Sequence, residues 1–377
     1  MAEKTQENLD IEKKILSILG ANARISINDL AGEVHIDKNK TYEIFNSIVE
    51  KYGIRFVPEI NIDALWHMEF ARQARLQTKR SIIGEAEEMM SNVGFSEYLM
   101  QIKFEEKAPN NDELISAAEK EYWIQFLAKT HGNYDALAYI VARPYDDLRY
   151  IISKLGAALK NYDMEISISK IWPYFGFFPL SKSLISQLKL FETYKNLLVG
   201  LLNAGRKNFS EMGKEFGQGY TQMLYSYDRL YRTNVLRRVT YYETKPNKKA
   251  YEAVSIKITN KEKFEKSKEE WYMHIIEQAN KGEQLYVYAC ETIAPFGNFV
   301  ILAGESTEEI KKEINYISKL KGVKVSSTHI DQSLIGALGI REFDMRYSFQ
   351  YQYLESRNKV PRIQEAIQKI EESPDRL

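Results

Sequence analysis

Lysine, asparagine and threonine side chains follow one another closely in a short polar segment near the N-terminus, at Lys38, Asn39, Lys40, Thr41 and Asn46. A lysine can pair with a phosphate oxygen or with the acceptor atoms of guanine, and an asparagine can form two hydrogen bonds to the edge of an adenine. The same residue types also occur on any solvated helix face. The segment therefore indicates either a surface that reads a nucleic acid or an ordinary polar face.

A second segment with hydroxyl, amide and guanidinium groups lies between residues 220 and 238. Its candidate base-contacting residues are Tyr220, Thr221, Gln222 and Arg229, and its candidate phosphate-contacting residues are Arg237 and Arg238. From residue 191 to 245, nine basic residues exceed five acidic ones, whereas from residue 10 to 57 seven basic residues balance seven acidic ones. The second segment is therefore favoured for phosphate binding. Packing against neighbouring helices is the alternative for Tyr220.

Two stretches with the same apolar pattern must position these side chains, and they are offset by 182 residues. Residues 11–54 predict three short helices, and the same order recurs from residue 197. Both stretches continue into β-prone segments, at residues 54–57 and 235–242. Three short helices followed by a hairpin are the elements of a winged helix-turn-helix, whose third helix presents its N-terminal residues to the major groove of DNA.

A second pair of similar stretches follows these helices, at an offset of 162 residues over most of its length. Residues 99–171 and residues 253–330 both predict the order β-α-β-β-α-β, which is the ferredoxin-like unit. The strands at 136–141 and 299–303 are nearly continuous in apolar residues, so they need cover on both faces. We therefore expect the two sheets to face each other across an internal pseudo-twofold axis.

The predicted fold class is α+β, a tandem repeat of a winged helix-turn-helix followed by a ferredoxin-like domain. The expected domains are winged helix-turn-helix units at 1–62 and 181–245, ferredoxin-like domains at 63–180 and 246–340, and a C-terminal helical arm at 341–377. Residues 66–94 have no counterpart in the second copy, so we interpret them as an inserted helical connector. The arm either docks on its own chain or pairs with a second chain.

Three motifs in the first half of the chain resemble the Lrp/AsnC (feast/famine) transcriptional regulators. They are Leu9 to Leu16, the run Arg24-Ile25-Ser26-Ile27-Asn28-Asp29-Leu30-Ala31, and the turn Gly132-Asn133-Tyr134-Asp135. The resemblance implies a transcriptional regulator whose ferredoxin-like domains, called RAM domains in this family, pair edge to edge and can bind amino acids. Family members usually carry one such unit per chain and dimerise, so this chain resembles a dimer within one polypeptide.

The resemblance also marks a candidate effector site, formed by Gly132, Asn133, Tyr134 and Asp135. Asp135 or backbone groups of this turn could bind the ammonium group of an amino acid. A plain β-turn, with Asn133 and Asp135 present for turn geometry, is the alternative that we favour. The second half departs from the motif, because Phe296-Gly297 stands where Tyr-Asp would be.

No catalytic, cofactor or metal motif is present in the sequence, which has one cysteine, Cys290, and five histidines without ligand spacing. His131 is the most tempting single residue, but no sequence partner accompanies it. Lysine plus arginine equals aspartate plus glutamate at 52 each, so only a local basic surface could attract a polyanion. We therefore expect no enzyme activity, no cofactor, no metal and no membrane span, and a cytoplasmic location.

The expected function is a DNA-binding transcriptional regulator. Its expected partners are double-stranded DNA, a small effector such as an amino acid, and a second copy of the chain. The alternative is a protein-interaction or effector-sensing scaffold in which the helix-turn-helix units no longer bind DNA. The balanced charge of the first unit and the 25 tyrosines favour this alternative.

Overall fold

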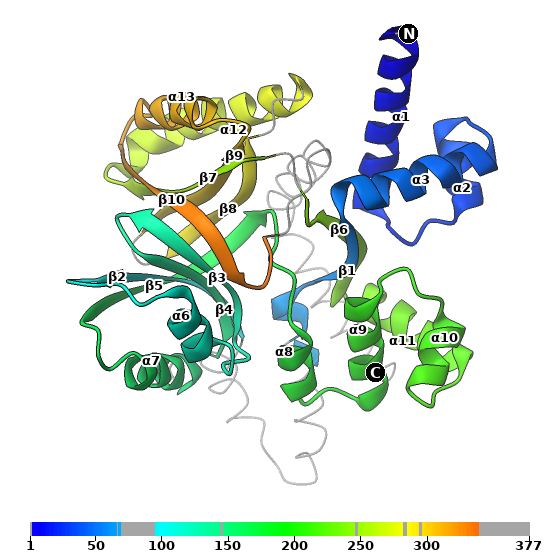
Figure 1. Cartoon of the computed structure of the whole chain (residues 1–377), viewed down its shortest axis with the longest axis horizontal. Coiled ribbons are helices and arrows are strands. Elements are labelled where there is room, and N and C mark those ends of the chain that lie inside the picture. The colour runs from blue at the N-terminus through cyan, green and yellow to red at the C-terminus, as the bar shows by residue number, and fades with distance from the viewer. Residues whose placement is uncertain are drawn as a thin grey trace, which may run out of the picture.

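The computed structural model describes residues 2–338 except 66, 69–94, 144–145, 246–247, 282–284 and 294–295. Most of the predicted connector at 66–94 and all of the predicted arm at 341–377 lie outside the described residues. The fold is α+β and repeats a winged helix-turn-helix followed by a ferredoxin-like unit, as the sequence predicts (Figure 1). None of the described helices is both long enough and apolar enough to cross a membrane.

The first helix-turn-helix unit comprises α1 (Ala2–Ala21), α2 (Ile27–Val34), α3 (Lys38–Tyr52) and β1 (Ile54–Ile60). Ser26 caps α2 by accepting a hydrogen bond from the backbone N of Asp29. α3 ends at Gly53, whose φ of +60° is the left-handed conformation that closes many helices. Buried Ile15, Leu30 and other apolar residues from the three helices form one core.

The second helix-turn-helix unit comprises α8 (Lys182–Gln187), α9 (Glu192–Asn203), α10 (Phe209–Glu215), α11 (Tyr220–Arg232) and β6 (Leu236–Glu243). The helices α9, α10 and α11 occupy the positions of α1, α2 and α3. Fully buried Leu197, Leu201, Met212 and Leu230 hold them together. The helix order of this unit thus follows the predicted repeat.

The two wings are not separate hairpins, which corrects the sequence prediction. β1 and β6 instead pair with each other in one two-stranded antiparallel sheet. β1 packs against α9 of the second unit, and β6 packs against α1 of the first unit. Tyr241 of β6 lies fully buried in the core of the first unit. Each unit therefore completes the other, because a single wing strand leaves its hydrogen-bonding edge open.

The register of this sheet is that of a twofold axis. Val57 pairs with Thr240, and Pro58 pairs with Val239. Under the repeat offset of 182 residues, Val57 corresponds to Val239 and Pro58 corresponds to Thr240. A twofold rotation therefore exchanges these two pairs, so the contact is isologous, like the interface of a symmetric dimer.

Each ferredoxin-like unit has the order β-α-β-β-α-β. The first unit consists of β2 (Ser96–Phe104), α6 (Asn111–Ala118), β3 (Ile124–Gly132), β4 (Ala136–Ala142), α7 (Asp146–Ala158) and β5 (Met164–Phe175). The second unit consists of β7 (Ala250–Ile258), α12 (Lys261–Lys281), β8 (Tyr286–Ile293), β9 (Phe296–Gly304), α13 (Thr307–Ser318) and β10 (Val323–Ile335). Their sheet orders, β5-β2-β4-β3 and β10-β7-β9-β8, are equivalent.

The two sheets close into one barrel, in which β5 pairs with β8 and β10 pairs with β3. The helices α6 and α7 lie on one side of the barrel, and α12 and α13 lie on the other (Figure 1). Across the interior, the Gln101 amide Nε2 donates to the Ser255 hydroxyl at 3.4 Å, although their strands are not neighbours. The sheets therefore cover each other's inner faces, which is why β4 is buried along its whole length.

Candidate nucleic-acid interface and effector turn

The first turn of α3 presents a polar surface to solvent. Asp37 caps the helix by accepting hydrogen bonds from the backbone N of Asn39 at 2.7 Å and of Lys40 at 3.3 Å. This cap leaves four predicted side chains exposed: Lys38, Asn39, Lys40 and Asn46. Thr41 is fully buried, and its hydroxyl donates to the Asp37 carbonyl at 2.9 Å. Thr41 therefore cannot contact a base, and its predicted role is wrong.

The equivalent face of α11 is also exposed, but it is more aromatic. Tyr220 is 54% exposed and Tyr225 is 63% exposed, so neither packs against a neighbouring helix as the alternative interpretation expects. The other predicted residues of this helix, Thr221, Gln222 and Arg229, are exposed as well. The structure therefore places all of the predicted α11 residues on one solvent-accessible helix.

The arginines of β6 are mainly engaged within the protein. The Arg238 Nε donates to Glu59 Oε2 at 2.8 Å, and Arg237 Nη1 lies 3.8 Å from Glu59 Oε1. Glu59 is buried, so these two positive charges balance a carboxylate that would otherwise be strongly destabilising. The expectation that Arg238 serves a phosphate is therefore wrong, whereas Arg237 remains partly exposed.

A reciprocal pair of arginines, one from each helix-turn-helix unit, fastens the two units together. The Arg24 Nη1 donates to the carbonyls of Gly205 at 2.6 Å and of Lys207 at 3.0 Å. Arg206 donates in return to the carbonyls of Ala23 and of Ile25, the latter at 2.9 Å. Donors and acceptors both follow the offset of 182, which confirms that the interface is isologous.

Aromatic rings flank both guanidinium groups. The Arg24 guanidinium carbon lies 4.2 Å from the ring centre of Phe209, and that of Arg206 lies 4.9 Å from the ring centre of Phe45. Desolvation by burial lowers the pKa of both arginines, yet an arginine stays charged at any physiological pH. The sequence analysis missed this pair, although an arginine recurring at the repeat offset was a visible signal.

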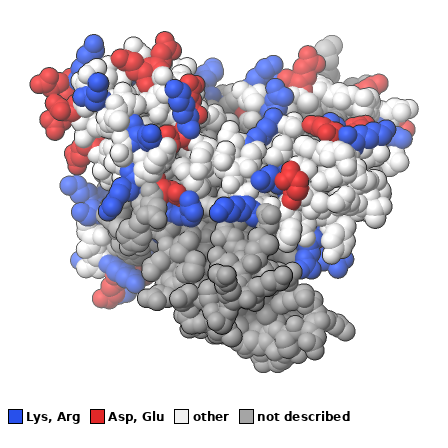
Figure 2. All heavy atoms as spheres, turned by 90° about the horizontal axis from the view of Figure 1, so that it is seen from below, with Lys and Arg blue, Asp and Glu red and all other residues white. Residues whose placement is uncertain are grey.

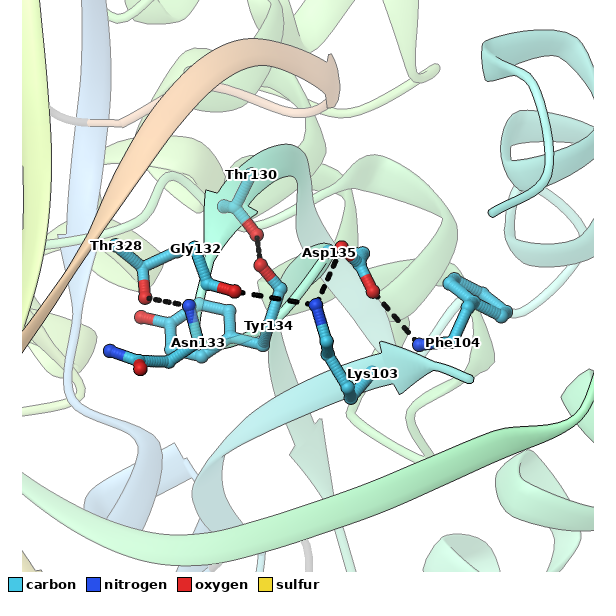
Figure 3. Close-up of polar contacts among 8 residues, drawn as sticks. All are labelled: Lys103, Phe104, Thr130, Gly132, Asn133, Tyr134, Asp135 and Thr328. Carbon is cyan, nitrogen blue, oxygen red and sulfur yellow. Dashed lines mark hydrogen bonds and ion pairs between the residues drawn. The ribbon is translucent and has the colours of Figure 1, made fainter. Parts of the chain in front are cut away.

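The candidate effector turn is held by protein partners at each of its polar side chains (Figure 3). Asp135 accepts a hydrogen bond from the Phe104 backbone N at 2.8 Å, and its other carboxylate oxygen lies 3.1 Å from Lys103 Nζ. The Asn133 Nδ2 donates to the Ser327 carbonyl of β10 at 2.8 Å. Tyr134 is buried. This arrangement favours the plain β-turn, one that also fastens the β3–β10 seam.

A buried acid and phenol form a pair that sequence reasoning did not single out. The Tyr139 hydroxyl donates to Glu97 Oε2 at 2.7 Å. Burial raises the pKa of Glu97 to about 7, against the opposing effect of the Tyr139 hydrogen bond and of the Arg237 charge. The Tyr139 ring stacks on Phe178, with ring centres 4.4 Å apart. A carboxyl group that titrates near neutrality can act as a general acid or base.

Charged side chains of both signs are scattered over the described surface on the face seen in Figure 2. This distribution agrees with the equal totals of basic and acidic residues in the chain. Binding of a polyanion would therefore depend on the two recognition helices and their immediate surroundings rather than on the field of the whole protein.

Comparison with known proteins supports the N-terminal assignment. Residues 9–46 match the family model for winged helix-turn-helix DNA-binding domains, which confirms this part of the predicted resemblance. No curated protein matches the chain. Among solved structures, LrpC of B. subtilis is similar over 38% of this chain and 96% of its own, with 14% identity and a TM-score of 0.33.

Similarity over nearly the whole chain is found with a different protein, the siroheme decarboxylase NirDL. Its structure matches 92% of this chain and 99% of its own, with 15% identity and a TM-score of 0.54. Its co-complex with an iron-uroporphyrin III analogue matches with 15% identity and a TM-score of 0.52. At this identity the likeness shows a shared tandem fold.

This finding overturns the expectation that the chain is not an enzyme. The expectation depended on the absence of familiar catalytic motifs and on a regulator-like order of elements. An enzyme has the same order of elements over the same length. The fold and the missing motifs therefore give no ground for excluding catalysis.

Proposed function

We propose that the chain is a cytoplasmic DNA-binding transcriptional regulator in which both helix-turn-helix units bind one duplex as the two halves of an intrachain dimer. The observation that carries this proposal is the isologous interface made by β1, β6, Arg24 and Arg206. It relates two exposed recognition helices by a pseudo-twofold axis. Dimeric helix-turn-helix proteins use such an axis to place two helices in successive major grooves, about 34–36 Å apart.

The two recognition helices offer different chemistry. α3 exposes Asn39 and Lys40, which suit an adenine edge and a guanine or phosphate, respectively. α11 exposes Tyr220, Gln222 and Arg229 within the unit that has the basic excess. The proposal therefore predicts an operator with two unlike half-sites, rather than a true palindrome.

Fluorescence anisotropy with a random duplex over a salt series tests DNA binding. Phosphate contacts require affinity to fall steeply as salt rises. Arg229→Ala should weaken binding to all sequences and flatten this salt dependence, whereas Lys154→Ala, which removes an exposed lysine of α7, should leave both unchanged. Absence of binding even at low salt would refute the proposal and favour the scaffold alternative.

A second candidate function is catalysis in the barrel, and the Glu97–Tyr139 pair favours it. These groups combine a carboxyl group that titrates near pH 7 with a hydrogen-bonded phenol beside aromatic rings. The protein that shares the tandem fold is a siroheme decarboxylase. Anaerobic incubation with siroheme, followed by measurement of released carbon dioxide, tests this candidate. Turnover that Glu97→Gln abolishes and Glu165→Gln preserves would support it, and no turnover by the wild-type chain would refute it.

A further inference from the structure

Equivalent positions of the two ferredoxin-like units differ in charge at one end of the barrel. In the first unit, Lys103 stands opposite Glu165 in the β2–β5 register, and its Nζ lies 3.1 Å from Asp135 Oδ1. In the second unit, Lys257 stands opposite Lys324 in the β7–β10 register. A lysine with two acidic neighbours in one half thus corresponds to a pair of lysines in the other.

Glycine occupies the position that corresponds to Asp135. Gly297 pairs with Lys257 in the β7–β9 register. A Cβ atom at Gly297 would lie 2.3 Å from the Ile256 carbonyl oxygen, so no aspartate fits there without a shift of the backbone. The close approach of β7 and β9 therefore keeps a carboxylate away from Lys257.

Both lysines lie on the inner face of the barrel. On β7, Val254 and Ile256 pack into the core beneath the helices of the second unit, whereas the intervening Ser255 meets Gln101 across the barrel interior. Because side chains alternate along a strand, Lys257 points to the same side as Ser255. Lys324 is its direct register partner and shares that face.

The inner face is open to solvent at this end. Lys257, Lys324 and Ser326 are exposed although they lie on it. The sheet topology explains this exposure, because the seams join β8 to residues 171–175 of β5 and β3 to residues 328–335 of β10. The earlier parts of β5 and β10, which include Ser167 and Lys324, take no part in these seams.

The lysine pair is unfavourable as it stands. Like charges directly opposite each other on antiparallel strands are destabilising. Within the described part of the chain, neither Lys257 nor Lys324 has an ion-pair partner within 4.0 Å. An oxyanion between the two ammonium groups would relieve this repulsion and form charge-assisted hydrogen bonds.

We propose that Lys257 and Lys324 bind a small organic oxyanion at the open end of the barrel. The hydroxyls of Ser255 and Ser326 and the amide of Gln101 line the same inner face and can hydrogen-bond the remainder of such a molecule. Carboxylates and phosphates share the required chemistry. The site stands independently of DNA binding, and it is the effector site of the regulator if the proposed function holds.

Isothermal titration calorimetry and thermal unfolding of the full chain test this site, with citrate and inorganic phosphate as probes at constant ionic strength. We expect saturable binding of at least one probe, which raises the unfolding midpoint more than sodium chloride does. Lys257→Gln and Lys324→Gln should each weaken binding about tenfold or more. Lys154→Gln, on the opposite helix layer, should leave binding unchanged.

The variant Lys324→Glu supplies the sharper result, because it recreates the lysine–glutamate register pair of the first unit. It should abolish anion binding and raise the unfolding midpoint measured without anion. Unchanged anion binding in Lys324→Glu would overturn the proposal, as would equal stabilisation by citrate and by sodium chloride. If Lys324→Glu weakens duplex binding while neither probe binds, the lysines contact DNA and the proposed small-molecule site is refuted. Binding of a probe without any DNA binding would leave this site standing and refute only the regulator.

Discussion

Replacing Arg24 by alanine tests whether the reciprocal arginines hold the two helix-turn-helix units together. The substitution removes hydrogen bonds from a charged donor to the Gly205 and Lys207 carbonyls and the contact with the Phe209 ring. Each such hydrogen bond contributes about 1.5–3 kcal/mol, and the ring contact adds roughly 0.5–1 kcal/mol. Because water can solvate part of the released carbonyl surface, we expect a loss of about 3 kcal/mol.

Hydrogen exchange measured by mass spectrometry gives the local free energy of opening and locates the loss. The drop of about 3 kcal/mol should appear in peptides covering 54–60 and 236–243, because β1 and β6 separate when the interface opens. Peptides covering 136–142 should keep their protection, because β4 lies in the barrel core. Arg206→Ala should have the same effect as Arg24→Ala, and Arg229→Ala on the exposed face should have none.

Two results would refute this reasoning. A change below about 0.5 kcal/mol in both arginine variants would mean that the interface does not depend on them. An equal loss of protection in the barrel peptides would mean that the variants act on global stability, not on the contact between the units.

Three further predictions follow from the site geometry. Glu97 has a folded-state pKa of about 7, above its ordinary value of 4.5, so the folded chain binds one more proton than the unfolded chain between these values; stability should fall as pH rises from 4.5 to 7, and Glu97→Gln should remove this part of the slope in urea unfolding. Arg238→Ala should cost about 3 kcal/mol of unfolding free energy, because it leaves the buried Glu59 carboxylate short of its closest partner; a loss below about 1 kcal/mol in denaturant titrations would contradict this role. Asn39→Ala should cost about 1–3 kcal/mol on a preferred DNA site only, whereas buried Thr41→Val should leave base preference unchanged, as measured by anisotropy on matched and mismatched duplexes.

Much of the fold was predictable because the repeat states each pattern twice. The periodic apolar residues of α9 to α11 repeat those of α1 to α3, so errors in one copy are corrected by the other. The ferredoxin-like order was recoverable for the same reason. The exposed positions of α3 followed from the Asp37 cap and the helical period, with Thr41 as the exception. At that position the side-chain hydroxyl bonds to its own helix instead of facing solvent.

The features that sequence reasoning missed all depend on contacts between segments far apart in the chain. A β-prone run following a third helix fits a hairpin wing as well as a strand paired with the other unit, and only the tertiary structure decides between them. The ion pair of Arg238 with Glu59 follows from that pairing, because 179 residues separate the two. Glu97 looked like a solvated residue in a strand, and the barrel closure that raises its pKa was invisible locally.

The most direct test of the intrachain dimer is hydroxyl-radical footprinting on duplexes selected for binding from a random pool, combined with light scattering of the complex. One chain per duplex with two protected regions, centred about 10–10.5 base pairs apart on one face of the DNA, is the result that the account predicts. Arg24→Ala should blur this spacing while leaving each recognition helix exposed. A single protected region per chain, or a complex that requires two chains to protect two regions, would contradict the account.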